Sequence, residues 1–381
     1  MKIGLYIHIP FCLQKCFYCD FPSHANLAFL YQPYITALCR EISGMGGVLT
    51  GHSVDTIYIG GGTPTLLSSK FLKQLLETVH KSFIIDQTAE ISIEANPGTV
   101  DKEKLVALRG GGVNRISFGV QSFSDSLLLS IGRIHSSAQA IEAVNLAKEV
   151  GINNINIDLM YGLPGQSIEQ LKASILQASE LDVTHISAYG LKVEEGTAFA
   201  DMEKEGKLLL PEEEIDEAMY EMTTQLLPKE GFLRYEISNF AKKGYECRHN
   251  LKYWRYQPYL GVGAAAHSFL KKERLANISD VSAYIKAVMN GELPLEQRET
   301  PDNNIAMAEY IFLVLRTVEG LSIEKFNQYF KTDFFHHYND KVAALASKGL
   351  IVITKEQLYL TSIGMKYGNI VFSTFLPEEN I

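Results

Sequence analysis

The 381-residue chain has few of the features that mark specialised protein classes. Only 12 residues are proline and 46% are hydrophobic, which excludes collagen-like, low-complexity and disordered proteins. No stretch reaches about 18 consecutive apolar residues, and the first residues lack the basic and then apolar pattern of a signal peptide. We therefore expect a globular protein that stays in the cytoplasm.

Positive charge is also scarce. The 35 Lys and Arg residues are outnumbered by 44 Asp and Glu residues, the formal net charge is −9, and no basic run is longer than two residues. Duplex nucleic acid needs a cationic surface. We therefore expect no nucleic acid partner.

The five cysteines are too few for a disulfide scaffold in a chain of this length. Cys12, Cys16 and Cys19 form the pattern C-x3-C-x2-C, whereas Cys39 and Cys247 lie apart and are interpreted as incidental buried thiols. Three thiolates on one loop can bind three irons of a cubane cluster, or a zinc ion with one further ligand. The residues near enough in sequence to complete a zinc site are His8, Asp20 and His24. The spacing alone leaves both sites open.

Short apolar runs alternate with helical patterns through the first 200 residues. The predicted strands are 5–9, 56–59, 90–94, 115–118, 154–159 and 185–191. The predicted helices between them are 68–83, 100–111, 136–151 and 167–180. Such alternation predicts parallel strands with crossover helices. Six strands are fewer than the eight of a complete barrel, so we expect an α/β fold with an incomplete (β/α)6-type barrel.

The pattern changes after residue 200. A charged helix is predicted over 211–227, an aromatic and glycine-rich segment follows it, and a compact helical tail begins near residue 300 and closes on a strand-like run at 357–362. We predict three parts: a partial barrel over 1–210, an aromatic-rich extension packed on it over 211–299, and a smaller, mostly helical domain over 300–381.

Polar or glycine-rich groups follow five consecutive predicted strands, at the end where parallel β/α folds collect their chemistry. The cysteine loop follows the first strand and the glycines of 60–64 follow the second. Glu94, Gln121 and Asp158 lie at the ends of the next three. Glycines expose backbone N–H groups that can receive a carboxylate or phosphate. The sequence predicts a functional site at this edge.

The cysteine pattern, with an aromatic residue before the third cysteine, and the GGGTP run together resemble the radical S-adenosylmethionine superfamily. The resemblance implies that Cys12, Cys16 and Cys19 hold a [4Fe-4S] cluster. It also implies that the amino and carboxylate groups of S-adenosylmethionine chelate the open iron, and that reduction of the cluster yields a 5′-deoxyadenosyl radical.

Within this superfamily the chain is most similar to the coproporphyrinogen III oxidase group, across nearly all of its length. The resemblance implies cofactor contacts at several positions, some of which serve a second cofactor molecule in the oxidases. These positions are Tyr6, Tyr18, Gly61, Gly62, Thr63, Glu94, Gln121, Arg133 and Asp158.

Two departures separate the chain from the oxidases. Phe21 stands where their motif has a fourth cysteine, and only eleven residues precede Cys12. Both departures favour the haem chaperone HemW branch, whose HNxxYW motif matches His249, Asn250, Tyr253 and Trp254, the only tryptophan. This resemblance implies that the chain binds haem and delivers it to apo-haemoproteins such as membrane-associated respiratory enzymes.

His249 is the candidate axial ligand of that haem, because neutral imidazole binds haem iron and aromatic neighbours cover a porphyrin. A histidine among aromatic residues is otherwise a packed, hydrogen-bonded residue. His336 and His337 are adjacent in a predicted helix, where successive side chains diverge, so we expect surface or packing roles for them.

Three functions stay open at this point. The first is a haem chaperone without porphyrinogen decarboxylase activity, the second is an oxygen-independent coproporphyrinogen III oxidase, and the third is a zinc-stabilised interaction module. Phe21 opposes the oxidase, and Glu94 in register with the glycine run opposes the zinc module. A homodimer is compatible with all three.

Overall fold

The structure is a computed structural model, and it describes residues 1–47, 49 and 51–377. Its centre is a twisted sheet in which six strands run parallel, each paired with the next. These strands are β1 (Lys2–Ile9), β4 (Ser53–Gly61), β5 (Ile85–Ala95), β6 (Arg115–Gln121), β7 (Asn154–Tyr161) and β8 (His185–Gly190). All six predicted strands are found, and the predicted α/β fold with a partial parallel barrel is confirmed.

Six further strands that we did not predict extend this sheet to twelve in the described part of the chain. β11 (Tyr259–Val262) pairs parallel with β1. It is followed by the antiparallel strands β12 (His267–Leu270), β13 (Glu273–Asn277) and β14 (Leu295–Glu299). At the other edge β10 (Asn239–Ala241) pairs antiparallel with β8, and β9 (Leu233–Arg234) pairs with β10. The two edges do not meet, so the barrel is open.

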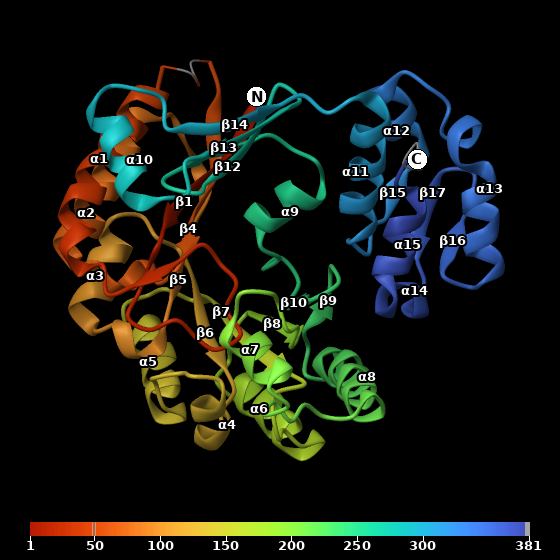
Figure 1. Cartoon of the computed structure of the whole chain (residues 1–381), viewed down its shortest axis with the longest axis horizontal. Helices are drawn as coiled ribbons and strands as arrows, with labels where there is room; N and C mark the ends of the chain where they lie inside the picture. Colours follow the sequence, from red (N-terminus) through yellow and green to blue (C-terminus); the bar gives the residue numbers. More distant parts are fainter. Residues whose placement is uncertain (48, 50, 378–381) are drawn as a thin grey trace.

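Helices cover the outer face of the parallel strands, as Figure 1 shows at its left side. They are α1 (Tyr31–Met45), α2 (Ser69–Ser82), α3 (Lys102–Gly110), α5 (Ser137–Glu149) and α6 (Ile168–Glu180), with the short α4 (Asp125–Ser130) after β6. In α2 the apolar side chains of Leu72, Leu75, Leu76 and Val79 recur at helical spacing and are buried. The N-cap Ser68 accepts a hydrogen bond from the backbone of Phe71, which fixes where α2 begins.

Four more helices connect or cover the strands between residues 198 and 289. They are α7 (Ala198–Lys204), α8 (Glu213–Lys229), α9 (Arg248–Trp254) and α10 (Val281–Met289). The predicted charged helix is α8. The seven-residue helix α9 lies on the inner side of the sheet (Figure 1), where it packs against β4 and against the C-terminal helix α11.

The C-terminal part is mostly helical, as predicted, and has a hydrophobic core of its own, which includes Ile311, Phe326, Phe334, Leu358 and Val371. It consists of α11 (Asn303–Leu315), α12 (Ile323–Phe330), α13 (Phe334–Ser347), α14 (Ser362–Lys366), α15 (Gly368–Phe375) and a small sheet of β15 (Leu321–Ser322), β17 (Gln357–Leu360) and β16 (Ile351–Ile353). The boundaries at residues 210 and 299 stay predictions.

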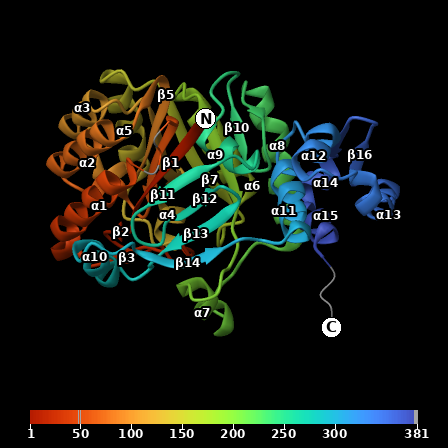
Figure 2. The ribbon, with the colours of Figure 1, turned by 90° about the horizontal axis from the view of Figure 1, so that it is seen from above.

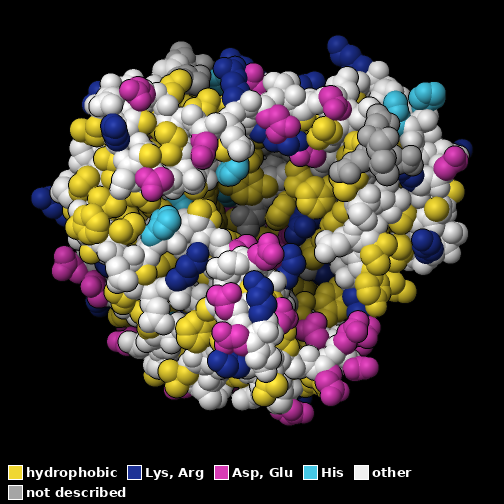
Figure 3. All heavy atoms as spheres, viewed as in Figure 1, with side chains coloured by type: hydrophobic (Ala, Val, Ile, Leu, Met, Phe, Trp, Pro, Cys, Tyr) yellow, Lys and Arg dark blue, Asp and Glu magenta, His cyan; other side chains and the backbone are white. Residues whose placement is uncertain are grey.

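The C-terminal helices stand to one side of the barrel, in both views of the ribbon (Figures 1 and 2). The face shown in Figure 3 carries acidic and basic side chains intermingled, and it is hollowed between the barrel and the C-terminal helices. Among the described residues, no helix combines the length and the apolar character needed to span a bilayer.

Candidate functional site

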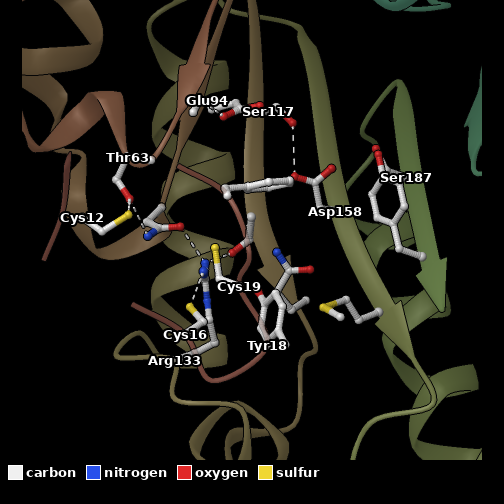
Figure 4. A pocket seen from close by; sticks show the side chains of 18 of the residues that line it. Cys12, Cys16, Tyr18, Cys19, Thr63, Glu94, Ser117, Arg133, Asp158 and Ser187 are labelled. Atoms are coloured by element: carbon white, nitrogen blue, oxygen red, sulfur yellow. Dashed lines mark hydrogen bonds between the residues drawn. The ribbon is translucent and has the colours of Figure 1, made fainter. Parts of the chain in front are cut away.

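A cavity of about 350 Å³ opens at the carboxyl ends of the parallel strands (Figure 4). The cysteine loop forms one wall, and the ends of β4, β5, β6, β7 and β8 form the others. Among the predicted site residues, those that line the cavity are Cys12, Cys16, Tyr18, Cys19, Gly61, Gly62, Thr63, Glu94, Gln121, Arg133 and Asp158. The fold therefore brings eleven predicted side chains or backbone groups to one place. Tyr6 and His249 do not line this cavity.

Backbone hydrogen bonds hold the entrance of the cysteine loop against the glycine run. The N–H of Gly62 donates to the carbonyl of Ile9 (2.8 Å), and the N–H of Thr63 donates to the carbonyl of Phe11 (2.7 Å). Cys12 lies in the short strand β2 (Phe11–Cys12), which pairs with β3 (His24–Ala25). The loop is thus fixed at the end of β4 before any ligand is bound.

Two hydrogen bonds reach the cysteine sulfurs. Thr63 Oγ1 lies 3.7 Å from Cys12 Sγ, and Arg133 Nη1 lies 3.4 Å from Cys16 Sγ. Both are drawn in Figure 4. The guanidinium of Arg133 also donates to Asn96 Oδ1 (2.6 Å) and to the carbonyl of Gly119. The three thiols are free and partly exposed toward the cavity. Donors aimed at sulfur stabilise thiolates, which are the form that binds metal.

The residues proposed to complete a zinc site do not gather around these sulfurs. In the part of the chain that the structure describes, no three His, Cys, Asp or Glu side chains lie close enough together to hold one metal ion. Both ring nitrogens of His8 are hydrogen-bonded elsewhere, Nδ1 to Tyr6 OH (2.9 Å) and Nε2 to the carbonyl of Pro22 (2.9 Å). A single tetrahedral zinc needs sulfurs within about 4 Å of one another. A cubane binds each thiolate on a different iron, so three separated thiols suit it better.

Glu94 sits at the centre of the polar wall. Its carboxylate accepts hydrogen bonds from Tyr58 OH (2.9 Å) and from the N–H of Gly61 (3.0 Å). A side chain at Gly60 would approach the Glu94 carboxyl to 2.9 Å, which explains glycine there. Gly61 has a φ of 113°, where other residues are strained. The glycine N–H that we expected to receive a ligand is therefore engaged by Glu94. Burial raises the pKa of Glu94 to about 7.

Asp158 on β7 and Glu94 on β5 line the same cavity, and β6 lies between their two strands. The carboxylate of Asp158 accepts from Asn156 Nδ2 (2.7 Å) and from Ser117 Oγ (3.4 Å), and burial raises its pKa. Gln121 ends β6 with a φ of 69°, which turns the chain away from the strand. These groups offer acceptors and donors that suit the hydroxyl groups and ring nitrogens of a nucleoside.

The two tyrosines of the prediction take different places. Tyr18 lines the cavity between the second and third cysteines, and burial raises its pKa. Tyr6 lies on β1 with its hydroxyl bonded to His8, and its ring stacks on Tyr58 at 6.4 Å. Tyr6 therefore does not line the cavity, and it affects the site by orienting His8 and Tyr58.

His249 is fully buried in α9. Its Nδ1 is hydrogen-bonded to Thr56 Oγ1 (2.9 Å), its Nε2 to Tyr253 OH (2.8 Å), and its ring stacks on Tyr58 at 5.3 Å. Burial lowers its pKa to about 3, so the ring is neutral. Trp254 packs under the guanidinium of Arg316, which lies 4.4 Å from the ring centre. Asn250 of the same motif lines the cavity. His249 stays a predicted haem ligand that must release a hydrogen bond before it can bind iron.

Sequence reasoning missed several polar residues of the cavity, namely Tyr58, Asn96, Arg115, Ser117, Asn156 and Ser187. Most occupy alternate positions of buried strands, such as Arg115 and Ser117 in β6 or Asn156 and Asp158 in β7. A polar residue at every second position of an apolar strand indicates an inner face that binds something. That signal was present in the sequence.

Comparison with known proteins agrees with this geometry. The Radical SAM superfamily model matches residues 6–178, which include the cysteine loop and Asp158, and the HemN C-terminal domain model matches residues 302–366. The chain is 38% identical over 374 residues to the heme chaperone HemW of Bacillus subtilis, covering 98% of this chain and 99% of that protein. This chain belongs to the HemW family.

A second HemW, from Escherichia coli, is 43% identical over 266 residues, which are 70% of this chain and 69% of that protein. Among solved structures, coproporphyrinogen III oxidase (HemN) from Escherichia coli, a radical SAM enzyme, superposes with a TM-score of 0.87. It is 24% identical and covers 98% of this chain and 90% of its own, so the HemW chain has the HemN fold. The resemblance read from the sequence is confirmed.

The site fits the cofactors that this superfamily uses. Three free thiols and two sulfur-directed donors suit a cluster with one iron left open. The buried carboxylates of Glu94 and Asp158, with the amide of Gln121, suit the ribose and adenine of S-adenosylmethionine. Phe21, at the position of the oxidases' fourth cysteine, is 61% exposed and lines the cavity mouth.

Proposed function

We propose that this chain is a haem chaperone that binds haem and delivers it to apo-haemoproteins, while carrying a [4Fe-4S] cluster and S-adenosylmethionine. The observation that carries the proposal is the 38% identity to a heme chaperone over 98% of this chain and 99% of the relative. The cavity supports this proposal. It brings together three cysteines that can bind the cluster and polar side chains that can hydrogen-bond S-adenosylmethionine.

The predicted site residues that line the cavity each have a proposed role. Cys12, Cys16 and Cys19 hold three irons of the cluster. Thr63 and Arg133 stabilise the thiolates of Cys12 and Cys16. When bound, the cluster and S-adenosylmethionine supply one-electron chemistry at the open iron. Gly61 and Gly62 line the cavity beside the cysteine loop and contact the methionyl part of S-adenosylmethionine.

Three of the remaining predicted residues orient the nucleoside, and the two tyrosines act elsewhere. Glu94 and Asp158 accept hydrogen bonds from ribose hydroxyls, and Gln121 offers an amide to the base. Tyr18 covers the cluster side of the cavity. Tyr6 orients His8, which in turn bonds the carbonyl of Pro22 behind the cysteine loop.

Haem transfer tests the function directly. The chain, loaded with haem and freed of excess, is mixed with an apo-cytochrome or with apo-myoglobin, and the recipient's Soret band is followed. We expect transfer from this chain to exceed transfer from haem-loaded serum albumin. Coproporphyrinogen should stay unconverted by the reduced, cluster-containing chain. Formation of protoporphyrinogen at a steady rate, without haem transfer, would identify an oxidase instead.

Three finer points belong to the proposal. Membrane-associated respiratory enzymes are the predicted recipients, and pull-down with haem-loaded chain from solubilised membranes tests them. A homodimer is tested by light scattering with and without the cluster. A cytoplasmic location is tested by fractionation of cells.

A further inference from the structure

The half-buried Arg316 follows α11, at the boundary between the barrel and the C-terminal helices, and its guanidinium has unused donors. Its Nε is buried without a hydrogen-bond acceptor. Its two Nη nitrogens are accessible, and no residue in the described part of the chain accepts a hydrogen bond from them or places a carboxylate oxygen within 4 Å. Arginines that leave water are otherwise paired.

The contacts that hold Arg316 are two aromatic rings. The guanidinium carbon lies 4.4 Å from the centre of the Trp254 ring and 5.9 Å from that of Phe312. The indole N–H of Trp254 is also buried without an acceptor. Stacking on a ring fixes the plane of a guanidinium but uses none of its N–H groups. Arg316 is therefore held in place with its donors free for a ligand.

Other arginines at this boundary have partners. Arg255, directly after α9, pairs with Glu319 at 2.7 Å. Arg234 on β9 donates to the carbonyl of Ile237 at 3.1 Å. Arg316 differs from both, because no described oxygen accepts from it.

Glu236 is the carboxylate that acts on Arg316, and it compensates the charge only in part. Its Oε1 accepts from the N–H of Ser238 (2.8 Å) and from Asn239 Nδ2 (2.6 Å), and no ion pair joins it to Arg316. Burial lowers the pKa of Arg316, although the charges of Glu236 and Tyr189 raise it. An added negative charge would therefore be stabilised here.

Arg316 lies beside the mouth of the cavity without lining it. Asn250 on α9 lines the cavity, and Trp254, four residues later, shares its face of the helix. Helix α9 packs against α11, and Figure 1 shows both at the boundary where Figure 3 shows the hollow between the barrel and the C-terminal helices. A ligand in this hollow reaches Arg316 without entering the cavity.

We infer that Arg316 binds a propionate of a haem that lies in this hollow, outside the cavity. A guanidinium presents paired N–H donors that match a carboxylate. The inference rests on the proposed function, which supplies the identity of the ligand. S-adenosylmethionine leaves no room for a porphyrin ring in a cavity of about 350 Å³, so the ring stays outside. The propionate then meets Arg316 without passing the cofactor.

The test compares haem with haem dimethyl ester, which lacks both negative charges. Binding to the cluster-containing chain, with S-adenosylmethionine present, is followed by the Soret band. Wild-type chain should bind haem at least about tenfold more tightly than the ester, the loss expected when one charge-assisted hydrogen-bonded pair is removed. In Arg316→Met the two ligands should bind alike, and Arg316→Lys should keep part of the preference.

Two further variants separate the missing charge from a disturbed boundary. Arg316→Gln keeps a polar side chain over Trp254 and should also lose the preference for haem. Arg255→Met is the matched control, because it removes a neighbouring positive charge that Glu319 already pairs. It should keep the wild-type ratio. Circular dichroism and the thermal midpoint show whether each variant is folded.

The outcomes separate this inference from the proposed function. If the wild-type chain binds no haem, both are overturned. If it binds haem but shows no preference over the ester, or if the ratio is unchanged in Arg316→Met and Arg316→Gln, the inference alone is overturned. Weaker S-adenosylmethionine binding in Arg316→Met with the haem ratio intact assigns Arg316 to the cofactor's own carboxylate and overturns it as well.

Discussion

Arg133 and Cys16, 117 positions apart in sequence, are joined by a hydrogen bond of 3.4 Å from guanidinium to sulfur. The bond links the segment between α4 and α5 to the cysteine loop after β1. It places a permanent positive charge beside Cys16, one of the proposed cluster ligands. Among the described thiols of the loop, no other has a hydrogen bond from an arginine.

Replacing Arg133 should therefore change the redox behaviour of the cluster. Hydrogen bonds and positive charge at a ligand sulfur stabilise the reduced, more negative state. Arg133→Met should lower the reduction potential by tens of millivolts, which we would measure by an anaerobic titration followed by electron paramagnetic resonance. Arg133→Lys, which keeps the charge, should lie between the two. Equal potentials in all three proteins would show that the bond has no electronic role.

The cysteines make a prediction about metal content. Anaerobically reconstituted chain should hold about four irons and four sulfides, and Cys12→Ser, Cys16→Ser or Cys19→Ser should lose them, because a hydroxyl is a poor ligand for this cluster. Cys39→Ser is the matched control, a half-buried thiol on α1, and should retain the full content. Stoichiometric zinc without the visible absorption of a cluster would support the interaction module.

Glu94 makes cofactor binding depend on pH. Its pKa of about 7 means that the carboxyl is half protonated near neutral pH, whereas ribose hydroxyls donate best to the ionised form. Affinity for S-adenosylmethionine should rise by up to about tenfold between about pH 6 and about pH 8. Glu94→Gln should bind more weakly at the higher pH and lose this dependence. Affinities are measured by calorimetry at each pH. The same pH dependence in wild type and Glu94→Gln would show that another group causes it.

The same carboxyl affects folding stability in the unliganded chain. Because its pKa is raised by folding, the native state holds a proton that the unfolded state has lost between about pH 4.5 and about pH 7. The free energy of unfolding therefore falls as pH rises through this window. Glu94→Gln should be more stable than wild type above about pH 7, by roughly 3 kcal/mol at most, with the difference vanishing near about pH 4. Urea titrations at several pH values measure it.

His249 is tested through its two hydrogen bonds. If it binds haem iron, His249→Ala should shift the Soret band and weaken haem retention while iron and sulfide stay unchanged. Tyr253→Phe removes the partner of Nε2 but keeps the ring, so its haem affinity should equal or exceed that of wild type. His249→Gln, which can still bond Thr56, controls for lost packing. An unaltered Soret band in both His249 variants would leave the residue a structural one.

Much of the barrel could be predicted because its strands are buried apolar runs bounded by turn residues. The hairpin of β12 and β13 could not, since Lys271 and Lys272 form its turn with φ values of 51° and 68°. Such turns favour glycine or asparagine, so the sequence gives no turn signal there. Helix α1 was missed because no side chain caps its start.

The candidate site divides in the same way. Cys12, Glu94 and Asp158 were found because short motifs and strand ends mark them. Arg115, Ser117 and Asn156 were not, although polar residues at alternate positions of β6 and β7 indicate an inner face. Which groups these residues face depends on how the strands pair across the fold, and a linear pattern does not show that pairing.

The pairing of β1 with β11 has a consequence for biosynthesis. The strand that leads into the cysteine loop is complete only when residues 259–262 lie beside it, after more than two thirds of the chain has been made. Contacts between such distant segments form slowly. On the ribosome, the first strand and its loop must wait for most of translation with one edge unpaired. We therefore expect the iron-sulfur cluster to be inserted after the chain has been synthesised. A nascent chain that lacks residues 259–262 should bind the cluster poorly.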